Sequence, residues 1–285
     1  MTTGWNLVLL LNMGAVAFGA DLERAQKLYD RTEYTPALEI LAKSTEPRNG
    51  AAWELAGKAN FQLREFKKAI EAFSKATQIE PKNSRYYNWL GRAWGRRAEA
   101  MNPLVAAGYA SDVRGNLERA VELDGKNQEA VSDLLDYYLA APALFGGGID
   151  KAMALAEKSK SNNAAEYHSL LARIAERQKQ YEQAESQLRQ AVTLAPKDVG
   201  RAVDLAMFLS RRGKYNESDA TFQQASKVEP DNRLVLYARA EAYIAAKRNL
   251  SSARDLLQQY LRSALTPDDP SREEARRLLK RASGD

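Results

Sequence analysis

The chain has 285 residues, of which 45% are hydrophobic and none is cysteine. Without cysteine it can form no disulfide and carry no cysteine nucleophile, which excludes small disulfide-stabilised domains and thiol enzymes. Its 42 lysine and arginine residues outnumber its 37 aspartate and glutamate residues, a formal net charge of +5. Because these charges are interspersed, a solvated surface is favoured and nucleic-acid binding is not expected.

The first segment, residues 1–20, has no charged side chain and contains an apolar run over 7–18. Small residues before Ala20 and Asp21 predict an export signal cleaved before one of these two residues, and hence a periplasmic or secreted protein. The segment lacks a lysine or arginine before the apolar run, so an uncleaved hydrophobic helix in a cytoplasmic protein stays open as the alternative. The run is shorter than the ~20 residues that span a bilayer, and no stable membrane span is expected.

The clearest pattern in the chain covers residues 51–83 and predicts a helical hairpin. Trp53, Ala56 and Gly57 are spaced as one face of a helix, and Pro81 ends the helix that follows. We expect Gly57 to lie where the two helices approach most closely, with large side chains filling the space beside it. The second helix carries the same spacing at Ala69, Ile70, Phe73, Ala76 and Ile79.

The pattern then repeats every 34 residues. Stepping forward by this period carries Trp53 to Tyr87 and Gly57 to Gly91. Further along, the same step relates Leu171 to Leu205, Tyr181 to Tyr215, Ala184 to Ser218, Leu188 to Phe222, Ala191 to Ala225 and Pro196 to Pro230. These residues and their spacing resemble the tetratricopeptide repeat (TPR) family.

The resemblance implies an all-α fold, a right-handed α-α superhelix of about six helical hairpins with a C-terminal capping helix. We expect a single solenoid over residues 21–285. The expected repeats are 21–49, 50–83, 84–127, 128–164, 165–198, 199–232 and 233–262, followed by a cap over 267–283.

Two insertions that lengthen the 34-residue repeat predict an edge of the molecule that differs from the regular repeats. The repeat at 84–127 has ten extra residues in its turn, with Asn102 and Pro103 as the expected start of the second helix. The next repeat has five extra residues in the sequence 139–152. We call the turns at these two insertions the insertion edge; its expected partner-docking residues are Leu104, Tyr109, Leu144 and Phe145, beside Val105. Mutual packing of these side chains is the alternative.

The same loop contains Gly146, Gly147 and Gly148 before an expected helix. A glycine-rich turn at a helix start can bind an anion, but Asp150 already supplies a negative charge there. We therefore assign the glycines to turn geometry.

The family resemblance places the groove wall on the first helix of each hairpin. It implies a peptide-binding surface formed by Lys58, Phe61, Arg85, Asn88, Arg92 and Arg96, which would be basic. Chaperone-binding members of the family hold a peptide's terminal carboxylate with lysine and asparagine at set places in three consecutive repeats. Glu129 and Asp133 stand in the third repeat here, which argues against that mode of binding.

The sequence shows no pattern of catalytic residues. The only histidine, His168, occupies the helix-packing position of Trp53, and no motif for zinc or phosphate binding is present. We expect no enzyme activity, no cofactor and no metal. The predicted function is a scaffold that binds a protein or peptide through the groove or the insertion edge. The alternative is a carrier of a small ligand or glycan, with Tyr86, Tyr87, Trp89 and Trp94 as stacking faces.

Overall fold

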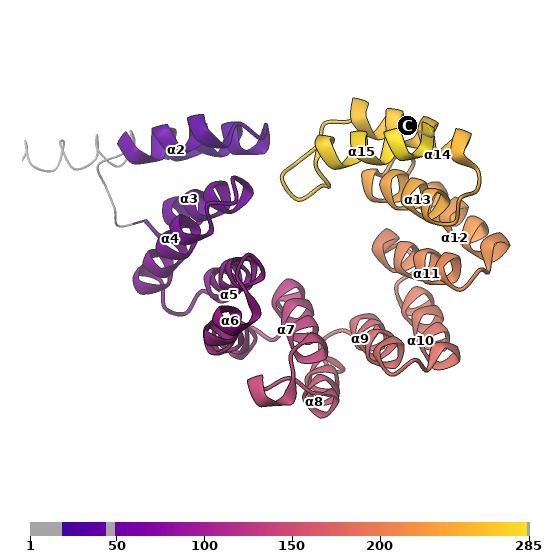
Figure 1. Cartoon of the computed structure of the whole chain (residues 1–285), viewed down its shortest axis with the longest axis horizontal. Coiled ribbons are helices and arrows are strands. Elements are labelled where there is room, and N and C mark those ends of the chain that lie inside the picture. Colours follow the sequence, from indigo (N-terminus) through magenta and orange to yellow (C-terminus); the bar gives the residue numbers. More distant parts are fainter. Residues whose placement is uncertain (1–18, 44–48, 284–285) are drawn as a thin grey trace, which may run out of the picture. The chain divides into compact units, whose positions relative to one another are not determined.

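The computed structural model describes residues 19–43 and 49–283. The predicted export signal lies almost wholly outside the described residues. All regular secondary structure within the described ranges is helical (Figure 1). The chain forms two compact units, which are described separately below. Unit 1 runs to Tyr137 and includes Pro142–Gly146, and unit 2 contains Tyr138–Ala141 and the residues from Gly147 onward.

Unit 1 consists of helical hairpins joined by short turns. Asn102 caps a helix that begins at Pro103, accepting a hydrogen bond from the backbone N–H of Val105, as the sequence predicts. After a helical stretch at 19–30, its elements are α2 (Tyr34–Lys43), α3 (Gly50–Gln62), α4 (Phe66–Ile79), α5 (Ser84–Glu99), α6 (Pro103–Leu123), most of α7 (Gln128–Ala140) and the 3-10 turn η1 (Ala143–Phe145).

The hairpin of α3 and α4 confirms the register that the sequence predicts. Gly57 lies against Phe73, and a Cβ atom on Gly57 would come within 2.5 Å of that ring. Phe73 is fully buried and stacks on Trp89 of the next hairpin, with 5.8 Å between ring centroids. The absence of a side chain at Gly57 therefore lets the aromatic pair fill the space between consecutive hairpins.

Unit 2 continues the same architecture. Its helices are α8 (Ile149–Ser159), α9 (Ala164–Arg177), α10 (Tyr181–Leu194), α11 (Val199–Arg211), α12 (Tyr215–Val228), α13 (Arg233–Ala245), α14 (Leu250–Arg262) and α15 (Arg272–Ser283). Asn249 adopts a left-handed conformation, with φ 49°, just before α14.

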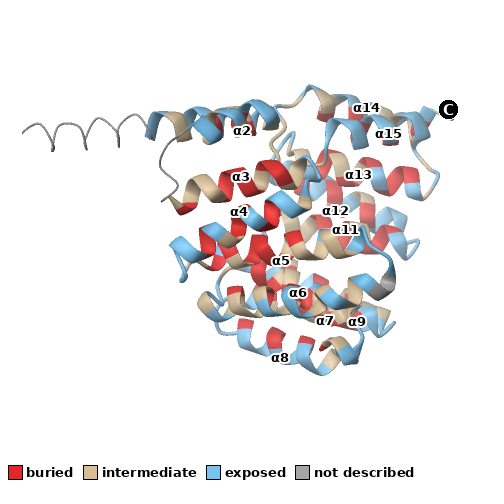
Figure 2. Ribbon diagram, turned by 60° about the vertical axis from the view of Figure 1, so that its left-hand side comes forward, coloured by how far each residue is buried: buried red, intermediate tan, exposed pale blue. Residues whose placement is uncertain are grey.

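The core of unit 2 runs along the facing sides of successive helices, where Figure 2 shows buried residues. Ala206, Ala225 and Ala240 are almost fully buried at helix contacts, while Phe222 and Leu257 fill the larger spaces. Small and large side chains thus alternate so that each hairpin packs on the next.

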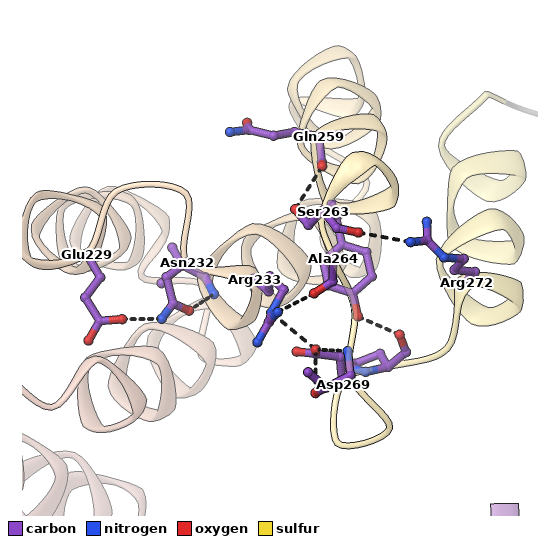
Figure 3. Close-up of polar contacts among 12 residues, drawn as sticks. Glu229, Asn232, Arg233, Gln259, Ser263, Ala264, Asp269 and Arg272 are labelled. Atoms are coloured by element: carbon purple, nitrogen blue, oxygen red, sulfur yellow. Dashed lines mark hydrogen bonds and ion pairs between the residues drawn. The ribbon is translucent and has the colours of Figure 1, made fainter. Parts of the chain in front are cut away.

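A polar clamp holds the segment between α14 and α15 (Figure 3). The Arg233 guanidinium donates to the Ala264 carbonyl and lies 3.2 Å from the Asp269 carboxylate. Arg272 donates to two carbonyls at the end of α14, including that of Ser263 at 3.0 Å. Together these contacts attach α15 to the preceding hairpin.

The structure confirms the all-α fold of helical hairpins ending in a packed terminal helix. That helix begins at Arg272, while residues 267–271 of the predicted cap form a turn in which Asp269 accepts a hydrogen bond from the Thr266 N–H. The repeat boundaries and the single solenoid stay predictions. None of the described helices is both long and apolar enough to cross a membrane.

Candidate functional site

The predicted peptide-binding residues all lie on α3 and α5, which together with α7 are the first helices of successive hairpins. We call their shared surface the first-helix face. The buried carboxylate of Glu54 lies between two cations of this face, 2.9 Å from Lys58 Nζ and 2.7 Å from an Arg85 nitrogen. Glu54 therefore links α3 to α5 and compensates part of the positive charge of both side chains.

A second group of charges links α5 to α7. Arg92 Nε lies 3.2 Å from the Asp133 carboxylate, and another Arg92 nitrogen lies 3.6 Å from Glu129. The same guanidinium covers the Trp89 ring at 4.6 Å. Burial raises the pKa of Asp133, and the charge of Arg92 opposes this shift.

These pairs correct the expectation of a basic surface. Arg96 also pairs with Glu99, at 2.6 Å, so each of the four predicted cations faces a carboxylate. Lys58 and Arg96 pair within their own helices, whereas Arg85 and Arg92 pair with carboxylates of a neighbouring helix.

The structure also corrects the assignment of Asn88. Its side chain is 0% exposed and lies beside the Asp133 carboxylate, where it lowers the pKa of that group. Asn88 therefore packs between α5 and α7 and is not part of the surface. Phe61 is half-buried, with its ring edge-on to Trp89 at 5.4 Å.

A surface cavity of about 1040 Å³ opens beside the first-helix face. It lies between the α4–α5 turn and the start of α7, and both signs of charge line it. Its lining residues include Lys82, Arg85, Glu80, Asp124 and Glu129.

The insertion edge separates into packed and exposed residues. Tyr109 is half-buried and lies on Trp94, with 5.2 Å between ring centroids. In contrast, Leu144 is 87% exposed and Val105 is 43% exposed. The side chain of Leu104 lies outside the described residues. Mutual packing therefore accounts for Tyr109 and does not account for Leu144.

Polar contacts fix the backbone that carries Leu144. The Tyr137 hydroxyl donates to the Phe145 carbonyl at 2.7 Å and lies 3.1 Å from the Ala110 carbonyl. Arg114 also donates to the Phe145 carbonyl, at 3.3 Å. The contacts from α6 place the two insertions side by side, as the sequence predicts, with the middle of α6 as the point of contact.

The backbone geometry of the turn explains the glycines after Leu144. Gly146 adopts φ 84°, a left-handed conformation that favours glycine. A Cβ on Gly147 would lie 1.8 Å from the Ala141 carbonyl oxygen, which no side chain could tolerate. Gly148, with φ 139°, then precedes α8. Turn geometry therefore explains all three glycines without a bound anion.

In unit 2, a nearly buried ion pair joins α9 to α11. Arg201 pairs with Glu166 and also donates to the Ser169 hydroxyl at 3.0 Å. Asp198 lies 3.4 Å from Arg201 Nε. On the same side of α11, Asp204 is exposed, yet the loss of hydration among its neighbours raises its pKa to about 6. The charges of Arg201 and Arg173 oppose that shift, while Asp198 and Glu166 add to it.

This raised pKa makes the stability of unit 2 depend on pH. Folded Asp204 binds its proton more tightly than an unfolded aspartate, whose pKa is about 3.9, so stability should fall as pH rises from about 4 to about 6. We expect Asp204→Asn to unfold at a higher temperature than the wild type at pH 7 and at the same temperature at pH 4. Thermal scans by far-UV circular dichroism at pH 4 and pH 7 measure this. Identical curves for wild type and Asp204→Asn at all pH values would contradict the shift.

The predicted packing role of His168 agrees with its contacts. Its Nδ1 lies 2.6 Å from Gln187 Oε1 on α10, and its ring lies edge-on to Tyr167 at 5.2 Å. The contact with Gln187 joins the two helices of one hairpin, α9 and α10. Within the ranges that the structure describes, no group of three or more metal-ligating side chains is present.

The aromatic side chains named for glycan stacking do not form an open platform. Tyr86 is 2% exposed and Trp89 is 7% exposed, so both belong to the core. Trp94 is covered by Tyr109, and Tyr87 faces the Arg119 guanidinium at 6.0 Å. This placement corrects the stacking hypothesis for Tyr86 and Trp89.

Comparisons with known proteins agree with this architecture. Residues 50–83, 165–198 and 203–270 match family models described as tetratricopeptide repeat. Tetratricopeptide repeat protein 37 of Xenopus laevis is 25% identical over 201 residues. That match covers 69% of this chain but only 12% of the relative's length.

Two solved structures share the fold. A tetratricopeptide repeat protein from Parabacteroides merdae aligns over 93% of this chain and 98% of its own, with a TM-score of 0.56 and 14% identity. A thermophilic TPR protein of Thermus thermophilus aligns over 67% of this chain and 98% of its own, with a TM-score of 0.52 and 21% identity. The hairpins, their packing residues and these matches together show that the chain contains tetratricopeptide repeats.

Proposed function

We propose that this protein is a non-enzymatic scaffold that binds a protein partner at the insertion edge, with Leu144 as the central contact. Tetratricopeptide repeats generally serve as protein–protein interaction modules, which supports the class of function. The choice of surface depends on the environment of Leu144.

The observation that carries the proposal is an exposed leucine on a fixed loop. Leu144 is 87% exposed, although the backbone next to it is held by Tyr137, Arg114 and the left-handed Gly146. A side chain that is already positioned loses little conformational entropy on binding. Burial of a leucine in a partner's pocket would remove its apolar surface from water.

The first-helix face is the second candidate. Its cations are paired with carboxylates, so an acidic peptide would have to displace existing ion pairs. The mixed charge of the adjoining cavity favours a polar peptide of low net charge. We therefore rank the first-helix face second, behind the insertion edge, as a candidate docking site.

The variant Leu144→Ala tests the first candidate. Because the side chain is exposed, the free energy of unfolding should change by less than about 0.5 kcal/mol. Affinity for a partner recovered with the wild-type chain should fall by about 2 kcal/mol, as for other central contacts in interfaces. Denaturant unfolding and calorimetric titration of the purified partner provide the two measurements.

A matched control is Leu194→Ala, which removes the same side chain from α10, where it is 50% exposed. This variant should retain both stability and partner affinity. If the Leu144 and Leu194 variants bind equally well, the insertion edge is not the docking site.

We also propose that the protein is exported and cleaved before Ala20 or Asp21. The uncharged apolar segment at the N-terminus supports this proposal. N-terminal sequencing of material from the native host should find one of these two residues first. Recovery of the uncleaved chain from the cytosol alone would overturn it.

A further inference from the structure

The last two turns of α15 carry a dense group of cations. Arg276, Arg277, Lys280 and Arg281 fall within six residues, and no other window of six residues in the sequence contains four lysine or arginine side chains. We call these four residues the α15 cation cluster.

The helix directs this cluster away from the core. Ala275, Leu278 and Ala282 are buried against the preceding hairpin. The four cations occupy most of the remaining positions of these turns and are all exposed, and Figure 2 shows α15 as largely exposed. Residues four positions apart lie on the same side of a helix, so the cluster forms two adjacent pairs.

Within the described part of the chain, none of the four cations forms an ion pair or a hydrogen bond. Other cations of this region are engaged, since Arg233 pairs with Asp269 and Arg272 donates to backbone carbonyls. The helix macrodipole favours cations in the last turn, which accounts for Lys280 and Arg281 but not for the two arginines before them.

We propose that the α15 cation cluster is a docking site for a short acidic segment of a protein partner. Carboxylates are the complementary groups for four exposed cations. Glu273 and Glu274 in the first turn of α15 limit the site to its last two turns, because they would repel an anion that extends further. A short run of aspartate or glutamate fits this limit.

The surroundings disfavour two other anionic partners. A nucleic acid carries phosphates continuously and is typically bound through many phosphate contacts or through aromatic side chains, and α15 has no aromatic residue. An anionic membrane is typically bound by helices that also insert apolar side chains, whereas Leu278 of α15 is buried and Leu279 is partly buried. The inference concerns a surface separate from Leu144 and does not depend on the function proposed there.

Titration with fluorescein-labelled hexaglutamate tests the proposal. The full chain should bind this peptide, and replacement of all four cluster cations by glutamine should weaken binding about tenfold through the loss of several exposed ion pairs. Binding should also weaken as salt rises from about 0.05 M to about 0.3 M, because the screening length shortens.

The control variant replaces four dispersed, exposed lysines by glutamine and removes the same total charge. These lysines are Lys67, Lys126, Lys197 and Lys227. The control should bind hexaglutamate as the wild type does. Equal weakening in both variants would show that net charge alone is responsible and would overturn the site.

Binding of two other kinds of anion, a nucleic acid and an anionic membrane, is measured in the same way. Tighter cluster-dependent binding of a single-stranded oligonucleotide, or of vesicles containing phosphatidylserine, would replace the acidic-segment proposal by a different class of partner. Circular dichroism of both glutamine variants should match that of the wild type, since the substituted side chains are exposed. Unchanged hexaglutamate binding by a folded cluster variant would also overturn the proposal.

Discussion

Replacement of Glu166 by alanine is expected to lower the free energy of unfolding of unit 2 by about 3 kcal/mol. Its side chain and that of Arg201 are 9% and 12% exposed, so removing the carboxylate leaves a nearly buried guanidinium. The Ser169 hydroxyl and the more distant Asp198 carboxylate are then its remaining partners. Because a buried charge without its counter-ion is strongly unfavourable, the loss should exceed that of a surface ion pair.

Glu176→Ala provides the matched comparison. Glu176 also joins α9 to α11, through a 2.9 Å contact with Arg211, but the two side chains are 31% and 53% exposed. Its removal should cost less than about 1 kcal/mol. Urea unfolding followed by far-UV circular dichroism measures both variants. If the two variants lose the same stability, burial does not determine the strength of the Glu166 pair.

The second large effect is expected for Gly57→Leu, which should destabilise unit 1 by about 3 kcal/mol, near the upper end for overpacked cores. The first atom of the new side chain would lie 2.5 Å from the Phe73 ring. Phe73 is fully buried and stacked on Trp89, so it cannot move aside without disturbing the next hairpin. The strain therefore extends over two hairpins.

Gly115→Leu is the control for this substitution. Gly115 lies within α6, and a Cβ there would meet no atom within 4 Å, so leucine should stabilise the helix by about 0.5–1 kcal/mol through its higher helix propensity. All four tryptophans of the chain precede residue 95, and tryptophan fluorescence therefore reports on unit 1. A Gly57→Leu variant with the wild-type fluorescence midpoint would contradict the packing of Gly57 on Phe73.

The helices and their registers could be predicted because each depends on local spacing. Apolar residues three and four positions apart defined the hairpins, and Asn102 with Pro103 marked the start of α6. Gly57 was identified as the point of closest approach from its place between larger apolar residues. These features require information only from residues close to one another in the sequence.

The charge balance and the side-chain exposure of the candidate surfaces could not be predicted in the same way. The partner of Arg85 is 31 residues away, and that of Arg201 is 35 residues away, so charge balance depends on how successive hairpins are offset. The family resemblance implies a surface role for Asn88, but this residue is buried because α7 supplies Asp133 beside it. The exposure of Leu144 likewise depends on contacts made by Tyr137 and Arg114.

The contacts that hold the η1 loop in place do not involve the side chain of Leu144. Tyr137 and Arg114 contact a backbone carbonyl, and Gly147 is fixed by the Ala141 backbone, so none of these contacts requires leucine at position 144. Substitutions at this position can therefore change the recognition chemistry while the supporting loop is preserved. Evolution could retarget such a scaffold by a single codon, and the same position suits the attachment of a photo-crosslinking amino acid.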